Sequence, residues 1–217
     1  MDIQTARTQM VHQQIRAWHV LEDRILAVFD ALPRDKFVPE AYRNMAYADV
    51  QLPLPHGEVM WAPKVEGRAL QALAPQPQET VLEIGTGSGY FAACLAKLGR
   101  EVLTVDIHPD FVENAGKTLK GLGVKNVRVE TRDGTRLDWC TERYDVIAVT
   151  GSLPTYDPAY GARLNVGGRL FMIVGTSPVM EALLVTRTGE DAWRTDYLFE
   201  TDLPALKNAA QPRHFRF

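Results

Sequence analysis

The sequence contains little cysteine, which excludes several classes of protein. Only two cysteines, Cys94 and Cys140, occur among its 217 residues. A disulfide-stapled secreted domain needs a denser cysteine framework, and a structural zinc site needs closely spaced cysteines or histidines that this sequence lacks. We therefore expect two reduced thiols packed in the core and no metal site.

Long apolar runs and an excess of positive charge are also missing. No segment approaches the roughly 20 apolar residues of a membrane span, and the first ten residues, MDIQTARTQM, lack the apolar stretch of a signal peptide. The formal net charge is −3, so no broad basic field would attract nucleic acid. These absences predict a soluble, cytoplasmic protein with neither a membrane nor a nucleic-acid partner.

The first third of the chain has the periodicity of helices. Residues 3–17 and 22–32 carry apolar side chains at helical spacing, and Pro33 ends the second of these segments. Three prolines and a glycine predict a long structured loop over 46–65, which is followed by a helix over 65–73.

From residue 80 onward, short apolar runs alternate with helical segments. The predicted strands are 80–84, 101–106, 126–131, 144–150, 168–174, 181–187 and 193–199, and the predicted helices are 90–98, 109–121 and 157–164. This alternation is typical of a doubly wound, mainly parallel α/β sheet, here with seven strands, and residues 188–191 make the last two strands an antiparallel hairpin. We expect one structural domain, with residues 1–78 as an N-terminal helical region and residues 79–217 as the core.

A glycine-rich turn follows the first strand of this core, from Gly85 to Gly89. The third glycine of the dinucleotide fingerprint G-x-G-x-x-G would fall on Tyr90, which disfavours a nicotinamide-dependent oxidoreductase. Glu83 precedes the first glycine by two residues. A carboxylate there suits a cofactor with an amino-acid end, whose ammonium group it can attract directly or through water.

Acidic residues also follow the next two strands. Asp106 ends the second strand, where a carboxylate can accept hydrogen bonds from both hydroxyls of a ribose. Asp133 follows the third strand, where it can accept a hydrogen bond from an adenine amino group. Because ligands of open α/β sheets bind at the carboxyl ends of the strands, these features predict one site. The predicted cofactor-binding residues are Glu83, Gly85, Thr86, Gly87, Ser88, Gly89, Asp106, Ile107, Asp133 and Gly134.

This arrangement resembles the class I S-adenosylmethionine-dependent methyltransferases, a family that also closes its sheet with an antiparallel strand. The resemblance implies S-adenosyl-L-methionine as cofactor and S-adenosyl-L-homocysteine as product. A narrower resemblance covers nearly the whole chain. Residues 10–15, 23–26, 33–39, 46–49 and 52–54 are similar to the N-terminal region of the protein-L-isoaspartate O-methyltransferase family, and residues 81–90 and 144–150 to its glycine motif and fourth strand.

The resemblance to this family also implies a catalytic activity. Asp133-Gly134 matches the family's Gly-Asp-Gly motif, except that Arg132 replaces the first glycine. The family transfers the methyl group to the side-chain carboxylate of L-isoaspartate in damaged proteins. Such a reaction needs in-line positioning and desolvation of the carboxylate more than acid–base chemistry.

The departures from the family gather on the acceptor side. The family's loop before the core reads approximately Gly-Gln-Thr-Ile-Ser-Gln-Pro, and here residues 57–63 carry Val59 at the threonine and Trp61 at the serine. An indole donates one hydrogen bond, but its bulk would fill a pocket made for a peptide. After the fourth strand, residues 151–154 replace the family's run of alanines before a proline. The acceptor-site candidates are therefore Val59, Met60, Trp61 and Ser152.

Several further residues allow two interpretations. His56 is either a general base beside the methyl site or a structural residue, and Glu58 is either a ligand of the cofactor or of a cationic group, or a solvated acid. Tyr156 and Tyr160 either line the acceptor side or only pack. The basic, aromatic tail 212–217 covers the site, mediates self-association or frays.

The leading hypothesis is an S-adenosylmethionine-dependent methyltransferase with altered acceptor specificity. One alternative is a genuine L-isoaspartyl protein carboxyl methyltransferase that binds its substrate through backbone contacts. Another is a catalytically inactive S-adenosylmethionine-binding protein in which Trp61 packs as core. The acceptor, either a protein or peptide carboxylate or a small molecule, and the oligomeric state stay open.

Overall fold

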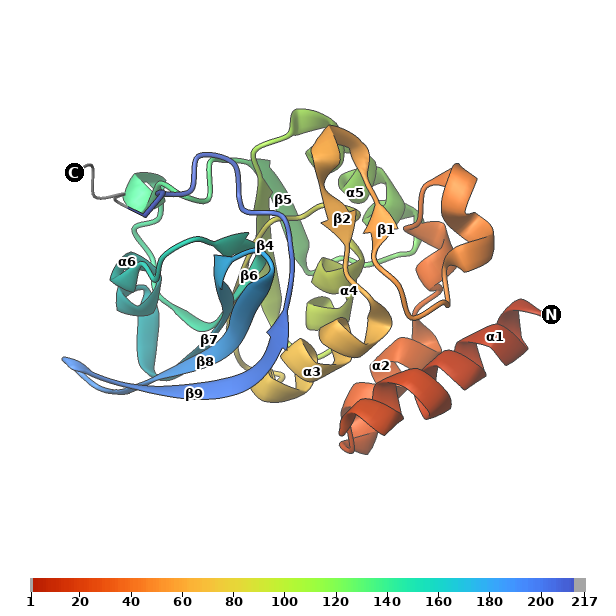
Figure 1. Cartoon of the computed structure of the whole chain (residues 1–217), viewed down its shortest axis with the longest axis horizontal. Coiled ribbons are helices and arrows are strands. Elements are labelled where there is room, and N and C mark those ends of the chain that lie inside the picture. Colours follow the sequence, from red (N-terminus) through yellow and green to blue (C-terminus); the bar gives the residue numbers. More distant parts are fainter. Residues whose placement is uncertain (1, 213–217) are drawn as a thin grey trace.

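The computed structural model of the chain describes residues 2–212, and a seven-stranded sheet forms its centre (Figure 1). The strands are β3 (Thr80–Ile84), β4 (Glu101–Asp106), β5 (Val127–Thr131), β6 (Tyr144–Leu153), β7 (Leu164–Thr176), β8 (Val179–Gly189) and β9 (Ala192–Thr201). Their order is β5-β4-β3-β6-β7-β8-β9. The first five of these pair in parallel, and β8 and β9 are antiparallel to their neighbours. This confirms the predicted mainly parallel sheet with a C-terminal antiparallel hairpin.

Six α-helices accompany the sheet within residues 2–212. They are α1 (Ile3–Gln9), α2 (Asp23–Ala31), α3 (Pro63–Leu73), α4 (Tyr90–Ala96), α5 (Pro109–Gly121) and α6 (Pro158–Ala162). Helix α1 continues through a π-helical turn over Met10–Ile15 and a 3-10 turn over Arg16–Trp18, so the predicted helix 3–17 is one helical segment of irregular pitch. Helix α2 ends before Pro33, because the residue preceding a proline avoids the helical conformation.

The segment 46–65 is more regular than the predicted loop. It contains a two-stranded antiparallel hairpin, β1 (Leu52–Pro53) and β2 (Val59–Met60), joined through a turn at Pro55–Gly57. Helix α3 begins at Pro63, inside the predicted loop, because a proline at the first helical position has no N–H that needs a partner. The short hairpin therefore leads directly into α3.

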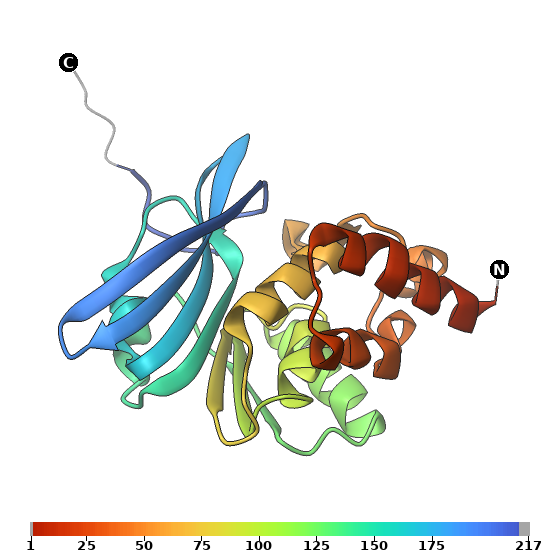
Figure 2. The same cartoon turned by 90° about the horizontal axis from the view of Figure 1, so that it is seen from below.

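Two hydrophobic clusters cover the two faces of the sheet. Along β3, Val81 belongs to one cluster and Leu82 to the other, as expected when successive side chains point to opposite faces. The first cluster includes residues of the N-terminal helices, α3 and α4, and the second includes Tyr160 of α6 and Ala209. Figure 2 shows α3 between the N-terminal helices and the C-terminal strands. The first cluster thus draws on both predicted regions, 1–78 and 79–217.

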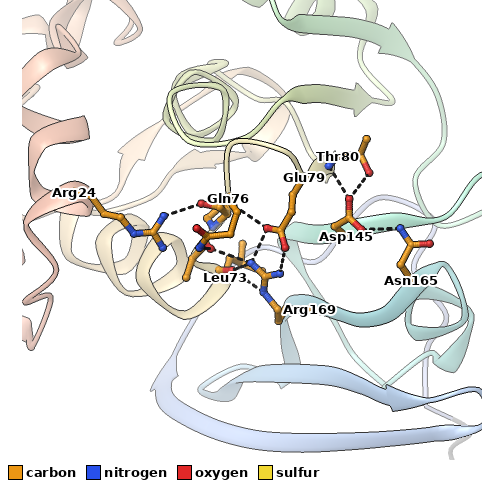
Figure 3. A network of polar contacts seen from close by, with 10 residues as sticks. Arg24, Leu73, Gln76, Glu79, Thr80, Asp145, Asn165 and Arg169 are labelled. Carbon is orange, nitrogen blue, oxygen red and sulfur yellow. Dashed lines mark hydrogen bonds and ion pairs between the residues drawn. The ribbon is translucent and has the colours of Figure 1, made fainter.

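A polar network fastens the end of α3 to the amino-terminal edge of the sheet (Figure 3). Arg169 of β7 donates to the carbonyl oxygens of Leu73 and Ala74 and to the Glu79 carboxylate, at 2.5 to 2.9 Å. A cation at the C-terminus of a helix satisfies carbonyls that have no partner within the helix. Nearby, the carboxylate of Asp145 accepts hydrogen bonds from both the backbone N–H and the hydroxyl of Thr80. This edge is therefore held by structural contacts, which leaves the opposite edge for a ligand.

Three other expectations concern the whole chain. Cys94 and Cys140 are buried and unpaired, as expected for core thiols. Within residues 2–212, none of the helices has the length and apolar character that crossing a bilayer requires. The interpretations of the tail 212–217 concern residues that, from 213 onward, lie outside the described part of the chain.

Candidate functional site

A cleft opens at the carboxyl ends of the central strands. It consists of two adjoining cavities, which share the lining residues Leu54, Val59, Gly85, Gly87 and Thr150. The first cavity reaches the residues that follow β4 and β5. The second reaches the start of α3 and α4 and residues 57–63, which we call the acceptor-side loop after their predicted role. This is the edge at which open α/β sheets bind ligands.

Asp106 organises the first cavity. Its carboxylate accepts hydrogen bonds from the backbone N–H groups of Gly87 and His108, each at 2.9 Å, and only 6% of the residue is exposed. These bonds join the glycine turn to the loop that leads into α5. Each carboxylate oxygen keeps a lone pair that can accept a further hydrogen bond, as from a ligand hydroxyl.

Asp133 lies on the opposite side of the first cavity. Its carboxylate accepts hydrogen bonds from the backbone and the hydroxyl of Thr135, at 3.0 and 2.6 Å, and from the Asn208 amide at 2.9 Å. Partial burial raises the pKa of this carboxyl, but the hydrogen bonds from Thr135 and Asn208 outweigh that effect and hold it below its usual range. Tyr160 packs beneath this loop and donates to the carbonyl of Gly134 at 3.0 Å, so its hydroxyl supports the loop.

Glu83 lies at the base of the second cavity and is completely buried. Its Oε2 accepts a hydrogen bond from the Thr104 hydroxyl at 2.6 Å, whereas its Oε1 has no partner among the described residues. Burial raises the pKa of Glu83 to about 8, because the Thr104 hydrogen bond opposes the loss of hydration only in part and Asp106 and Glu66 repel the charge. A buried acceptor without a partner indicates a missing donor, such as a ligand.

The glycine turn brings backbone to the wall of the cleft. A Cβ on Gly85, whose φ is +102°, would lie 2.3 Å from the Thr150 hydroxyl oxygen, and a Cβ on Gly134 would lie 2.2 Å from a methyl of Ile84. Only glycine fits at these two positions. Gly89 does not line either cavity; it begins α4 with a φ of +81° and packs against Ala115.

The acceptor-side loop forms one wall of the second cavity. Val59, Met60 and Trp61 all line it, and Trp61 is only 5% exposed. The indole packs against Phe91 and Phe171, with ring centroids 5.4 and 5.8 Å away. The apolar pair Met60-Trp61 is therefore part of the core and of the cleft wall together.

Ser152 lines neither cavity, although the sequence marked it as an acceptor-site candidate and the preceding residues Thr150 and Gly151 line the first cavity. It is completely buried, and its hydroxyl donates to the Leu203 carbonyl at 3.0 Å. Its backbone N–H and carbonyl bond to Pro204 and Leu206, at 3.0 and 2.9 Å. Ser152 therefore holds the C-terminal segment, which in turn brings Leu206 and Lys207 to the first cavity.

The remaining candidates lie at the rim or outside it. His56 stacks on His108 with ring centroids 4.0 Å apart, and its Nε2 is 3.0 Å from the Asp110 carboxylate. Its ring is held by these contacts outside the cavity lining, which supports the structural interpretation. Glu58 lines the first cavity and forms an ion pair with Lys207 at 3.3 Å. Tyr156 is 42% exposed and lines neither cavity.

Comparison with known proteins agrees with this geometry. The family model described as protein-L-isoaspartate(D-aspartate) O-methyltransferase matches residues 5–203. The chain belongs to the protein-L-isoaspartate O-methyltransferase family. Membership of this family makes the chain an S-adenosylmethionine-dependent methyltransferase and confirms the predicted cofactor.

Relatives in this family span most of the chain. Protein-L-isoaspartate O-methyltransferase 1 of Rhodopseudomonas palustris (strain HaA2) is 38% identical over 193 residues, which are 88% of this chain and 79% of the relative. The protein-L-isoaspartate O-methyltransferase of Gloeobacter violaceus is 39% identical and covers 82% of this chain and 88% of its own length. A provisionally assigned family member of Plasmodium falciparum, crystallised with S-adenosyl-L-homocysteine, has a TM-score of 0.81 at 18% identity, covering 95% of this chain and 99% of its own. This last similarity shows the same fold.

Several residues of this methyltransferase line the cleft although the sequence did not single them out. They are Leu54, Ile84, Val105, His108, Phe111, Arg132, Thr135, Thr150, Gly151, Leu206 and Lys207 in the first cavity, and Glu66 and Phe91 in the second. Thr150 and Val105 lie near strand ends, a signal that the sequence contained. Leu206 and Lys207 reach the cleft through long-range contacts of the C-terminal segment, which carry no local sequence signal.

Proposed function

We propose that this chain transfers the methyl group of S-adenosyl-L-methionine to an acceptor other than the L-isoaspartyl carboxylate. The observation that carries the proposal is Trp61, which lines the second cavity at the position where the sequence resemblance to the family has a serine. The family assignment supports S-adenosyl-L-methionine as the methyl donor. The side chains of the acceptor-side loop are the evidence for the identity of the methyl acceptor.

The chemistry of the cleft fits the donor. The free Oε1 of Glu83 matches an ammonium group, Asp106 matches ribose hydroxyls, and Asp133 matches an adenine amino group. The other residues proposed to hold the cofactor are Gly85, Thr86, Gly87, Ser88, Ile107 and Gly134, whereas Gly89 lines neither cavity and serves the start of α4. When bound, the sulfonium supplies a methyl group that is already activated. The protein's task is therefore to orient an acceptor and to exclude water from it.

An isoaspartyl carboxylate finds little support on the acceptor side. The side chains of Val59 and Met60 offer no hydrogen-bond donor, and the indole of Trp61 offers one N–H at most. A carboxylate desolvated against these side chains would lose hydration without gaining equivalent hydrogen bonds. The buried indole also occupies space next to Phe91 that a smaller serine would leave open.

Two other functions are tested by the same experiments. Genuine isoaspartyl repair is favoured by relatives of this name at 38% and 39% identity, and would rely on backbone donors of the loop. A cofactor-binding protein without transfer activity is disfavoured by the family membership, although the packing of Trp61 between Phe91 and Phe171 gives the indole a structural use as well.

Calorimetry with S-adenosyl-L-homocysteine tests the shared premise, since a folded protein that does not bind it would exclude all three functions. A labelled-methyl assay on an isoaspartyl peptide then separates them. We expect turnover at least about 100-fold below that of a relative that carries the serine, corresponding to about 2.7 kcal/mol of lost transition-state stabilisation. Equal turnover would instead establish repair activity. Cofactor binding with no transfer to any of a broad set of acceptors would favour the third function.

A further inference from the structure

Glu66 lines the second cavity, and one of its two carboxylate oxygens has no hydrogen-bond partner among the described residues. It lies in the first turn of α3, lines the cavity and is 2% exposed. Its Oε2 pairs with the guanidinium of Arg34. Its Oε1 accepts no hydrogen bond from residues 2–212, yet it is not among the fully buried unpaired atoms. This oxygen therefore keeps some exposure, and Glu66 is a lining residue of the second cavity.

Arg34 pairs with Glu66 from outside the lining of the second cavity, and its Nε–H has no hydrogen-bond partner among the described residues. Arg34 is completely buried, donates to the Trp61 carbonyl and to Glu66, and lies over the Tyr90 ring at 4.8 Å. Burial raises the pKa of the Glu66 carboxyl despite the attraction of Arg34, so one guanidinium compensates only in part for the lost hydration.

The lining of the second cavity has the composition of a cation site. Its ionisable residues are Glu66 and Glu83, and none of its described lining residues is a lysine, arginine or histidine. The walls include Trp61, Phe91 and Met60, whose aromatic rings and thioether favour a positive group over a negative one. Since the free oxygen of Glu83 matches the cofactor's own ammonium, Glu66 is left for a second positive group.

We infer that this cavity binds the ammonium group of an amine-bearing methyl acceptor and that Glu66 determines this specificity. For transfer, the bound ammonium would first give a proton to the Glu66 carboxylate. The freed nitrogen lone pair would then bond to the methyl carbon as the methyl–sulfur bond breaks, and S-adenosyl-L-homocysteine and the methylated amine would leave. The inference rests on the proposed function, because it names the acceptor class of the same site. A cationic acceptor meets a carboxylate oxygen and aromatic walls there. A carboxylate acceptor meets no basic side chain in the described lining, so its desolvation is not compensated there.

Three probes of similar shape test the charge preference directly. The full chain, saturated with S-adenosyl-L-homocysteine, is titrated in a calorimeter with 2-phenylethylamine, 3-phenylpropanol and 3-phenylpropionate. We expect the amine to bind at least about tenfold more tightly than the carboxylate, with the alcohol between them. Equal affinities, or a preference for the carboxylate, would overturn the inference. This measurement needs no variant and no turnover.

Glu66→Gln identifies the residue responsible, because it removes the charge and keeps a carbonyl oxygen for Arg34. The variant should lose the preference for the amine while its affinity for S-adenosyl-L-homocysteine stays within about twofold of that of the unmodified chain. Weaker binding of S-adenosyl-L-homocysteine with an unchanged amine preference would assign Glu66 to the cofactor and overturn the inference. Glu113→Gln, at an exposed site on α5, is the matched control. If Glu66→Gln does not fold, the probe series on the unmodified chain still decides.

A methyl-transfer assay distinguishes two possible sources of the amine, a small molecule and a lysine side chain of a peptide. One arm uses small alkylamines and the other uses lysine-containing peptides, each with the isoaspartyl peptide as reference. Transfer to either amine source supports the inference, and transfer to the isoaspartyl peptide alone contradicts it. If S-adenosyl-L-homocysteine itself does not bind, the proposed function fails first. If it binds but the three probes are not distinguished, only the amine specificity fails.

Discussion

Trp61 packs against Phe91, the second residue of α4, with ring centroids 5.4 Å apart and ring planes at 50°. Trp61 belongs to the acceptor-side loop, and α4 begins directly after the glycine turn. This contact joins the wall of the acceptor side to the element that carries the cofactor motif. A substitution at Trp61 therefore changes the wall of the proposed acceptor site and also removes a packing contact with α4.

Trp61→Ser should create activity on isoaspartyl peptide. The substitution removes the indole from the cavity wall and restores the hydroxyl that the family resemblance expects. We expect methyl transfer to a labelled isoaspartyl peptide to rise at least about tenfold, corresponding to 1.4 kcal/mol. Removal of a side chain that is 5% exposed should also lower the free energy of unfolding by about 3–5 kcal/mol. The assay is therefore run well below the unfolding temperature of the variant.

Trp193→Ser is the matched control for that change. This indole is 40% exposed on β9, where its N–H donates to the Gly161 carbonyl, and it lines neither cavity. The Trp193→Ser variant should have a somewhat lower free energy of unfolding and should gain no methyl transfer to the isoaspartyl peptide. If Trp61→Ser folds and its turnover of the isoaspartyl peptide equals that of the unmodified chain, Trp61 is not the cause of the altered specificity.

Glu83 should make the ligand-free protein less stable as the pH rises. Burial raises its folded-state pKa to about 8, above the value near 4.5 of an exposed glutamate, so the folded chain binds more protons between these values. Its contribution is fully present below about 4.5 and is lost as the pH rises through about 8. Urea unfolding at pH 6 and pH 8 should show a smaller decline for Glu83→Gln than for the unmodified chain.

The same carboxyl should release a proton when the cofactor binds. At pH 7 a carboxyl with a pKa of about 8 is mostly protonated, and an arriving ammonium group favours its ionised form. Calorimetry with S-adenosyl-L-homocysteine in buffers of different ionisation enthalpy measures this release. A binding enthalpy that does not vary with the buffer would show that Glu83 does not ionise on binding.

The sequence was sufficient to predict that the acids and glycines after successive strands lie at one edge of the sheet. Parallel strands end at one edge, so acids and glycines after successive strands must meet there, and Glu83, Asp106 and Asp133 do. The seven strands were also predictable, because alternating apolar runs and helical segments leave few other arrangements.

The acceptor side could not be predicted to the same extent, because distant segments build it. The Ser152 hydroxyl bonds to a carbonyl 51 residues away, and Arg34 pairs with Glu66 across 32 residues. Neither contact has a spacing or a motif that marks it in the sequence. A serine after a strand end therefore suggested a substrate contact, whereas its hydroxyl was needed to hold the C-terminal segment.

Ser152→Ala should weaken the C-terminal segment without changing acceptor selectivity. The substitution leaves the Leu203 carbonyl without its donor in a buried position, which costs about 1–3 kcal/mol of unfolding free energy. Because the segment brings Leu206 and Lys207 to the first cavity, S-adenosyl-L-homocysteine should also bind more weakly. Ser177→Ala, which removes an exposed hydrogen bond to Asp202, is the control and should change stability by less than about 0.5 kcal/mol. If Ser152→Ala changed the relative affinities of the acceptor probes, Ser152 would be a residue of the acceptor site after all.

Arg169→Gln should destabilise the fold and leave cofactor affinity intact. Arg169 bonds to two carbonyls at the end of α3 and to Glu79, at the edge of the sheet opposite the cleft (Figure 3). Because a glutamine cannot replace all of these donors, we expect a loss of about 2–3 kcal/mol in unfolding free energy, measured by urea denaturation.

Arg194→Gln, in an exposed ion pair with Asp196, is the control and should cost less than about 1 kcal/mol of unfolding free energy. S-adenosyl-L-homocysteine should bind both variants equally well, since neither arginine lines the cleft. Equal stability of the two variants would mean that the network at this edge does not hold α3 to the sheet.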